Sequence, residues 1–227
     1  MYAKFWKRAL DLILSVTAFI ILLPLLLLLT LIGAIAMRGN PFFVQIRPGR
    51  GEKLFRLIKF RTMTNKKDEY GKLLPDGERL CAYGKFLRAT SLDELPSLLN
   101  IIAGDLAIVG PRPQLVRDMV FMTETQRLRH TVRPGLTGLA QCNGRNGIKW
   151  EQKLDYDNIY ISRGITFSGD FKIILKTVGS VFRRDGINED GCASARDYGD
   201  YLLDCGKVTR DEYEQKQAEA EKLLGIK

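Results

Sequence analysis

The sequence contains one histidine, His130, and only four cysteines among 227 residues. The cysteines (Cys81, Cys142, Cys192 and Cys205) are far apart and form no Cys-x-x-Cys motif. Zinc sites draw most of their ligands from Cys and His at short spacings, so this composition argues against zinc. A disulfide framework is equally unsupported, and free thiols in a reducing compartment fit best. A single histidine also gives no basis for a Ser-His-Asp triad.

Charge is missing altogether from Leu12 to Met37, a run of 26 mostly apolar residues. As a helix with a rise of 1.5 Å per residue, this run would be about 39 Å long, more than a hydrocarbon core of about 30 Å requires. It is too long for the core of a signal peptide, and no small-x-small cleavage site precedes a polar segment. The sequence therefore predicts a segment embedded in a membrane.

The path of this segment is open to two interpretations. Pro24 lies at its middle, where proline removes one helical hydrogen bond and clashes with the preceding turn. Cations, which favour the cytoplasmic side, flank the run at both ends: Lys4, Lys7 and Arg8, then Arg38, Arg47, Arg50, Lys53, Arg56, Lys59 and Arg61. A kinked spanning helix is common. A re-entrant helix broken at Pro24 would instead keep both basic flanks on one face. These residues alone favour neither the spanning nor the re-entrant helix.

A net charge of +9 favours phosphate-bearing partners. After the apolar run, cations alternate with phenylalanines, and turn residues separate two short strands, 43–46 and 53–60. This pattern predicts a β-hairpin. Because the hairpin directly follows the membrane segment, lipid headgroups or a lipid phosphate are expected as its partners, and nucleic acid is not.

The remaining pattern is mostly helical. A polar loop is expected at 65–77, a buried strand in "DLAIVGPRP" (105–113) and an irregular glycine-rich segment at 132–147. Helices are expected at 78–87, from 98 onward, and at 114–131, 149–162 and 170–184. Thr209 and Glu212 form a capping box before a charged amphipathic tail helix. Together these elements predict an α+β fold that is mostly helical.

Two adjacent carboxylates, Asp93 and Glu94, lie between basic and apolar residues. Ser91 and Glu94 fit the S-x-x-E capping box, and acids near a helix N-terminus interact favourably with its dipole. Proline, however, prefers the first helical position, and a helix that starts at Pro96 leaves both acids in the preceding turn. The pair either caps a helix or performs chemistry.

Three arginines accompany the acids in the sequence: Arg88, Arg112 and Arg133. Carboxylates alone would repel a phosphate substrate, so such a site needs cations and a divalent metal to screen it. One acid can then attack phosphorus while the other holds Mg²⁺. The pattern therefore makes phosphate chemistry the alternative to a helix cap.

Several motifs occur in order at fitting distances: "KFRTM" (59–63), "RATSLDELPSLLNIIAGDLAIVGPRP" (88–113) and "RPGLTGLAQ" (133–141). Together they resemble the bacterial sugar transferase family, the monotopic phosphoglycosyl transferases, most closely its small single-domain members. The resemblance implies transfer of a sugar-1-phosphate from a UDP-sugar to polyprenol phosphate with release of UMP. That reaction is the first membrane step of glycoconjugate assembly.

The resemblance also implies residue roles. Asp93 matches the nucleophile that forms a covalent phosphoglycosyl intermediate, and Glu94 matches the Mg²⁺ ligand. Arg88 and Arg112 match cations that contact phosphate, and the segment Pro111-Arg112-Pro113 matches the one near the nucleotide. Arg133, at the start of its own motif, is expected to join these phosphate contacts.

For the membrane segment, the resemblance favours a re-entrant helix broken at Pro24, with both termini cytoplasmic at the bacterial inner membrane. The family often has serine before this proline, where a hydroxyl can bond the freed carbonyl. This chain has Leu23, so Ser15 and Thr17 are the nearest preceding hydroxyls.

These inferences divide the chain into a re-entrant helix (1–38), a compact cytosolic catalytic domain with interfacial amphipathic helices (39–185) and a tail (186–227). The charged tail is compatible with a homodimer. Two rival hypotheses remain: a membrane-attached glycosyltransferase that releases UDP and uses the acids only for metal, and a basic membrane adaptor in which the acids cap a helix.

Overall fold

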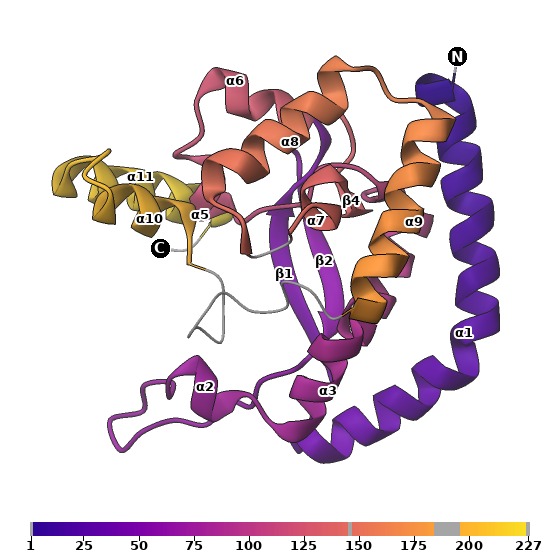
Figure 1. The fold of residues 1–227 in the computed structure, drawn as a ribbon. Helices are drawn as coiled ribbons and strands as arrows, with labels where there is room; N and C mark the ends of the chain where they lie inside the picture. The colour runs from indigo at the N-terminus through magenta and orange to yellow at the C-terminus, as the bar shows by residue number, and fades with distance from the viewer. Residues whose placement is uncertain (1, 145–146, 184–195, 226–227) are drawn as a thin grey trace.

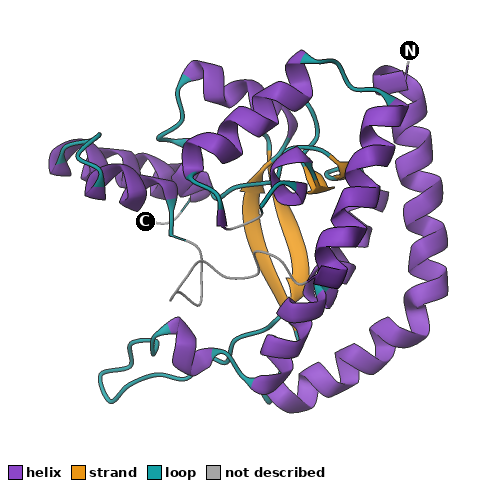
Figure 2. Ribbon diagram, in the orientation of Figure 1, coloured by secondary structure: helices purple, strands orange, loops and turns teal. Residues whose placement is uncertain are grey.

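The computed structural model describes residues 2–144, 147–183 and 196–225 (Figure 1). Within these residues, helices predominate over two small two-stranded sheets (Figure 2), which confirms the predicted α+β class. Cys192 and the predicted boundary between residues 185 and 186 lie outside the described residues. The three-part division therefore stays a prediction.

The apolar run forms one long helix, α1 (Lys7–Met37), after a short π-helical turn (Tyr2–Trp6). The helix is long and apolar enough to cross a membrane. Its buried residues are few: Asp11, Ser15, Leu26, Leu29 and Gly33. Because most of its apolar side chains are not covered by protein, the helix needs lipid around it.

Pro24 lies inside α1, and the helix continues through it. Figure 1 shows that α1 changes direction partway along its length instead of ending and restarting. The predicted break is therefore wrong in detail, because the structure has one bent helix. A bend is the usual effect of the hydrogen bond and the space that proline removes. Ser15 donates to the Leu12 carbonyl (3.1 Å), not to a carbonyl freed by the proline.

The predicted hairpin is confirmed. β1 (Phe42–Pro48) and β2 (Leu54–Phe60) are antiparallel, and Phe42 lies opposite Phe60 with stacked rings 5.5 Å apart. In the turn between the strands, Gly51 has φ +63°, a conformation that glycine adopts readily. Alternate side chains of a strand share a face, which places Arg47 of β1 on the same side as Lys59 of β2.

The second sheet is parallel and confirms the buried strand. β3 (Ala107–Val109) pairs with β4 (Gly135–Thr137), a strand in the segment expected to be irregular. A Cβ at Gly135 would lie 2.1 Å from the amide nitrogen of Gly110. The chain after β3 and the chain entering β4 can therefore meet only because both positions are glycine.

Most predicted helices are present with shifted ends: α3 (Ala82–Thr90), α4 (Leu98–Ala103), α8 (Trp150–Ser162) and α9 (Phe167–Arg183). Two short helices, α2 (Asp76–Arg79) and α7 (Leu139–Cys142), were not predicted as separate elements.

The single helix expected at 114–131 is wrong. The chain instead forms α5 (Val116–Met119), α6 (Glu124–Arg127) and a 3-10 turn (Leu128–Thr131). Two internal caps explain the interruption. Asp118 accepts from the amide of Leu115 (3.0 Å), and Thr123 forms a capping box that starts α6.

The tail forms α10 (Tyr198–Asp204) and α11 (Arg210–Leu224), and the predicted Thr209 capping box is confirmed. α11 packs on α5, where Ala220 meets a cluster with Val116 and Val120. Figure 1 shows α10 and α11 together beside α5, the helix that follows the Pro-Arg-Pro segment.

Asp118 joins this tail to α5, and its loss should destabilise the protein. The side chain is 2% exposed and accepts from the amides of Leu115 (3.0 Å) and Tyr198 (2.8 Å). Asp118→Ala leaves both amides unpaired, and at about 1–3 kcal/mol each the free energy of unfolding should fall by about 2–6 kcal/mol. Thermal unfolding of the solubilised protein checks this, with Asp105→Ala at an exposed position as the control. Equal melting temperatures for the two variants would refute it.

Candidate functional site

The two acids lie in a 3-10 segment (Leu92–Ser97) between α3 and α4. Ser97 Oγ donates to the Ile58 carbonyl (2.8 Å). The side-chain amide of Asn100 accepts from the Ile58 amide (3.0 Å) and donates to the Arg56 carbonyl (2.8 Å). These bonds satisfy the outer edge of β2, which would otherwise lack a partner strand. They also fix the segment that carries the acids against the hairpin.

The helix-cap interpretation of the acids is wrong. Ser91 has a left-handed backbone (φ 57°), and its side chain makes no capping hydrogen bond to the described residues. Only its backbone carbonyl accepts from the Glu94 amide (3.4 Å). The Glu94 carboxylate is directed to two cations instead.

Glu94 is the centre of an ion-pair cluster. Its Oε1 accepts from Lys59 Nζ of β2 (2.6 Å) and from Arg112 Nη2 (2.9 Å). Burial alone would raise the pKa of Glu94, but the charges of Arg112 and Lys59 outweigh burial and hold this pKa far below its ordinary value. Glu94 is therefore ionised at any physiological pH.

Asp93, directly before it, has a different environment. Burial and then the charge of Glu94 raise the pKa of Asp93 to about 6, against the opposing effect of Lys59, Arg112 and Arg88. The carboxylate is still mostly ionised at neutral pH. It makes no hydrogen bond or ion pair with the residues that the structure describes. A half-buried, ionised carboxylate that remains unengaged is suited to nucleophilic attack.

Arg88 lies on the side of Asp93. Its Nε donates to Thr62 Oγ1 (3.1 Å), just beyond β2. Burial lowers the pKa of Arg88, and the charge of Asp93 opposes that effect. The structure thus brings four predicted residues together: Asp93, Glu94, Arg88 and Arg112.

Buried groups fix the backbone of Arg112. Its carbonyl accepts from Arg129 Nη2 (2.5 Å), and Arg129 pairs with Asp157 of α8 (2.7 Å). The side chains of this pair are 1% and 2% exposed. An ion pair that is fully buried resists displacement, since breaking it leaves an uncompensated charge. Arg112 therefore presents its guanidinium to Glu94 from a fixed backbone.

The prolines of the same segment are fixed through their carbonyls. Pro111 accepts from the amide of Gly135 (2.8 Å), and Pro113 accepts from Arg47 Nη1 (3.1 Å). The segment is thus held by β4 on one side and by the hairpin on the other.

Arg133 is placed elsewhere. Its Nε donates to the Gly104 carbonyl (2.9 Å) at the end of α4, where Arg8 of α1 also donates to the Ile101 and Ile102 carbonyls (2.5 and 2.9 Å). Two guanidinium groups thus donate to the last carbonyls of α4, where a helix lacks its full set of backbone donors. The expected phosphate contact of Arg133 is not supported, because its side chain serves this helix end.

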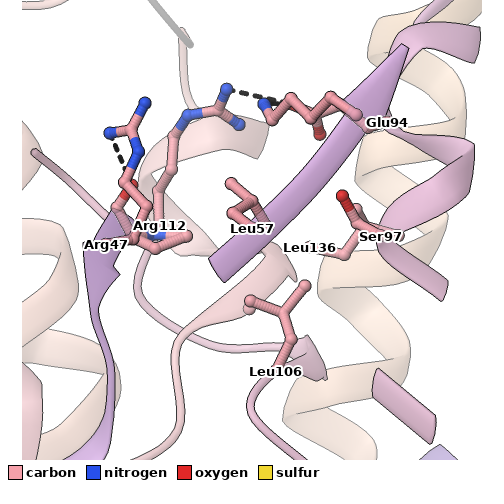
Figure 3. Close-up of a pocket in the computed structure, with 10 residues that line it drawn as sticks. Arg47, Leu57, Glu94, Ser97, Leu106, Arg112 and Leu136 are labelled. Atoms are coloured by element: carbon pink, nitrogen blue, oxygen red, sulfur yellow. Dashed lines mark hydrogen bonds and ion pairs between the residues drawn. The ribbon is translucent and has the colours of Figure 1, made fainter. Parts of the chain in front are cut away.

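A small pocket lies between the hairpin and the Pro-Arg-Pro segment (Figure 3). Its lining combines cations, Glu94 and apolar side chains: Arg47, Leu57, Lys59, Glu94, Ser97, Leu106, Arg112, Pro113, Gly135 and Leu136. The sequence pattern predicts that Arg47 and Lys59, as hairpin cations beside the membrane segment, meet lipid headgroups or a lipid phosphate, and it assigns neither to the acid pair. Strand alternation in the predicted hairpin places both residues on one face, but nothing in the sequence indicates that this face meets Glu94.

The donor groups fit magnesium. Mg²⁺ is usually held by one or two carboxylates together with substrate phosphates and water. Glu94 uses only Oε1 for its two cations, which leaves Oε2 available, and the carboxylate of Asp93 is adjacent. The described residues contain no cluster of three or more His, Cys, Asp or Glu side chains suited to a metal, so a bound ion would need substrate oxygens as further ligands.

Comparison with known proteins agrees with this site. An uncharacterized sugar transferase of Bacillus subtilis, EpsL, is 44% identical over 191 residues, which cover 83% of this chain and 93% of that protein. A UDP-glucose:undecaprenyl-phosphate glucose-1-phosphate transferase of Klebsiella pneumoniae is 38% identical over 76% of this chain, which spans only 39% of that longer protein. The exopolysaccharide production protein ExoY of Rhizobium meliloti is 33% identical over 77% of this chain and 84% of its own length.

A family model described as bacterial sugar transferase matches residues 2–184, most of the chain. This match confirms the resemblance inferred from the motifs and excludes the adaptor hypothesis. The protein is an enzyme of the bacterial sugar transferase family.

Proposed function

We propose that this enzyme transfers a sugar-1-phosphate from a UDP-sugar to a polyprenol phosphate by way of a covalent intermediate on Asp93. The names of the relatives support the substrate classes, since the Klebsiella protein is named for UDP-glucose and undecaprenyl phosphate. A Salmonella typhimurium relative, 34% identical over 81% of this chain, is named an undecaprenyl-phosphate galactose phosphotransferase. The observation that carries the mechanism is the contrast within the acid pair: Glu94 pairs with two cations, whereas the Asp93 carboxylate makes no hydrogen bond or ion pair with the described residues.

In the first step, a carboxylate oxygen of Asp93 attacks the phosphorus that bears the sugar. A phosphorus–oxygen bond to Asp93 forms, the bond between the two phosphates breaks, and UMP leaves with the electron pair. Arg112, which pairs with Glu94, and Arg88, whose charge interacts with that of Asp93, stabilise the charge that develops on the phosphoryl oxygens. Phosphoryl transfer depends mostly on such positioning and charge stabilisation, so the site needs no elaborate acid-base set.

In the second step, a phosphate oxygen of the polyprenol phosphate attacks the same phosphorus. The bond to Asp93 breaks, the carboxylate is regenerated, and polyprenyl-diphosphate-sugar is released. Two displacements at one phosphorus give net retention of configuration there. Glu94 is the residue that would hold Mg²⁺, and a bound ion supplies neutralisation of the diphosphate charge.

The product nucleotide tests this proposal. With UDP-glucose or UDP-galactose and undecaprenyl phosphate, the enzyme should release UMP in step with formation of the lipid-linked sugar phosphate. Release of UDP instead would support the rival glycosyltransferase, in which the acids serve only the metal. The same screen over a wider set of UDP-sugars identifies the donor.

We also propose that α1 is re-entrant at the cytoplasmic face of the bacterial inner membrane. Contacts at both ends of α1 support this topology. Near its start, Lys7 pairs with Asp170 of α9 (2.6 Å); in its second half, the Leu29 carbonyl accepts from Tyr83 of α3 (2.8 Å). A helix that spanned the bilayer would separate its two ends by about 30 Å of hydrocarbon and could not contact the same domain at both.

Labelling of single cysteines tests the topology. In a variant with its four natural cysteines replaced by serine, Ala3→Cys and Lys53→Cys place exposed thiols before and after α1. A membrane-impermeant thiol reagent should modify both only after the cytoplasmic face is opened. Modification of Ala3→Cys in intact cells would contradict the re-entrant path and favour a kinked spanning helix.

A further inference from the structure

Arg47 of β1 is a cation that the proposed mechanism does not use. Its Nη1 donates to the Pro113 carbonyl (3.1 Å), and its Nη2 donates to Gln45 Oε1 (2.6 Å). Its Nε is buried and has no hydrogen-bond partner among the described residues. A guanidinium has five N–H donors, so most of the capacity of Arg47 is unused.

Arg47 also lacks a counter-ion within the part of the chain that the structure describes. The other two cations of the pocket, Lys59 and Arg112, share Glu94. Arg47 makes no ion pair with any residue that the structure describes. Asp118, the acid whose charge acts most strongly on Arg47, already accepts hydrogen bonds from the amides of Leu115 and Tyr198. A buried charge without a partner is costly, and such charges are normally paired.

Arg47 does not avoid the cost of an unpaired charge by losing its proton. Burial, and then the charge of Arg112, lower the pKa of Arg47 to about 10, which leaves the guanidinium charged at neutral pH. The pocket therefore contains three cations (Arg47, Lys59 and Arg112) and one carboxylate, Glu94. A pocket with this excess of positive charge is suited to an anion.

The geometry favours a phosphate as that anion. Figure 3 shows the guanidinium groups of Arg47 and Arg112 extending in the same direction, away from Leu106. Two guanidinium groups aligned in this way can present parallel N–H donors to phosphate oxygens. The Arg47 side chain is also tied to the segment that carries Arg112, because its Nη1 donates to the carbonyl of Pro113, the next residue.

We propose that Arg47 binds a phosphate group of a substrate together with Arg112, and that this phosphate is the counter-ion the pocket lacks. The inference rests on the proposed function, which supplies two sources of phosphate: the diphosphate of the UDP-sugar and the phosphate of the polyprenol acceptor. Arg47 would thereby be a phosphate-binding residue of the site, in addition to its structural contact with Pro113.

Binding measurements on Arg47→Met test the proposal without turnover. Full-length protein in nanodiscs of phosphatidylethanolamine and phosphatidylglycerol is titrated separately with UDP and with undecaprenyl phosphate. Removing a charged hydrogen-bond donor should weaken the affinity for one of these probes about tenfold or more. Weaker binding of UDP assigns the phosphate subsite to the donor, and weaker binding of undecaprenyl phosphate assigns it to the acceptor. Unchanged affinity for both overturns the inference.

Two further variants separate binding from structure. Arg56→Met removes the same charge from an exposed position of the same hairpin and should leave both affinities within about twofold. Arg47→Lys keeps the charge and should recover part of the lost affinity. If it recovers none and both Arg47 variants melt at lower temperature, Arg47 acts only through Pro113, which also overturns the inference. Failure of the proposed function would appear differently, as no sugar-phosphate transfer by the unaltered enzyme.

Discussion

Asp93→Asn is expected to abolish turnover while binding of the UDP-sugar survives. Asparagine has nearly the same shape but a far weaker nucleophile, so the first displacement cannot proceed. We expect a loss of at least about a thousandfold, or about 4 kcal/mol of barrier at 1.36 kcal/mol per decade. UMP release measures the turnover, and titration with the UDP-sugar measures binding.

The matched control is Asp105→Asn, which makes the same change at an exposed aspartate after α4 and should retain activity within about twofold. Removing a negative charge from the phosphate site should, if anything, tighten binding of the anionic donor. Substantial activity in Asp93→Asn would refute its role as nucleophile. Loss of donor binding together with activity would point to a structural role.

Glu94→Gln is expected to have the second large effect, and removal of magnesium by a chelator should mimic it. Glutamine keeps the size of the side chain, but it loses the charge that pairs with Lys59 and Arg112 and that would hold a divalent cation. We expect at least about a hundredfold lower turnover, equivalent to about 2.7 kcal/mol.

The dependence of activity on magnesium distinguishes a role of Glu94 as metal ligand from a purely structural role. If Glu94 holds the ion, Glu94→Gln should require a higher magnesium concentration for half-maximal activity, whereas a purely structural role would lower the maximum without that shift. Glu124→Gln, at an exposed position on α6, is the matched control. Full activity of the unaltered enzyme in excess chelator would contradict the assignment of magnesium.

The sequence predicted the elements that local chemistry specifies. The hairpin follows from alternating residues around a glycine turn, the buried strand from an apolar run ending at Gly110, and the tail helix from the box of Thr209 and Glu212. The interruption at 114–131 was missed because its two local caps, Asp118 and the box that begins at Thr123, lie within an apolar spacing typical of a single helix. The bond between Asp118 and Tyr198 joins residues 80 positions apart, and single-sequence patterns carry no information on such a contact.

Part of the candidate site was also predictable from local sequence. Asp93, Glu94, Arg88 and Arg112 were recognisable from motifs, and the structure brings them together. Lys59 and Arg47 were missed as site residues because their role depends on which face of the hairpin meets the Pro-Arg-Pro segment. Arg133 was expected near the phosphate site because it begins a motif. Its side chain instead lies at the end of α4, a contact that sequence proximity to a motif does not reveal.

The most direct test is to trap the intermediate on the enzyme. Protein incubated with a UDP-sugar labelled in the sugar-bearing phosphate, without acceptor, should retain label on the peptide that contains Asp93, and added undecaprenyl phosphate should discharge it into lipid. Lipid-linked product accumulating while no label ever resides on that peptide would contradict the account.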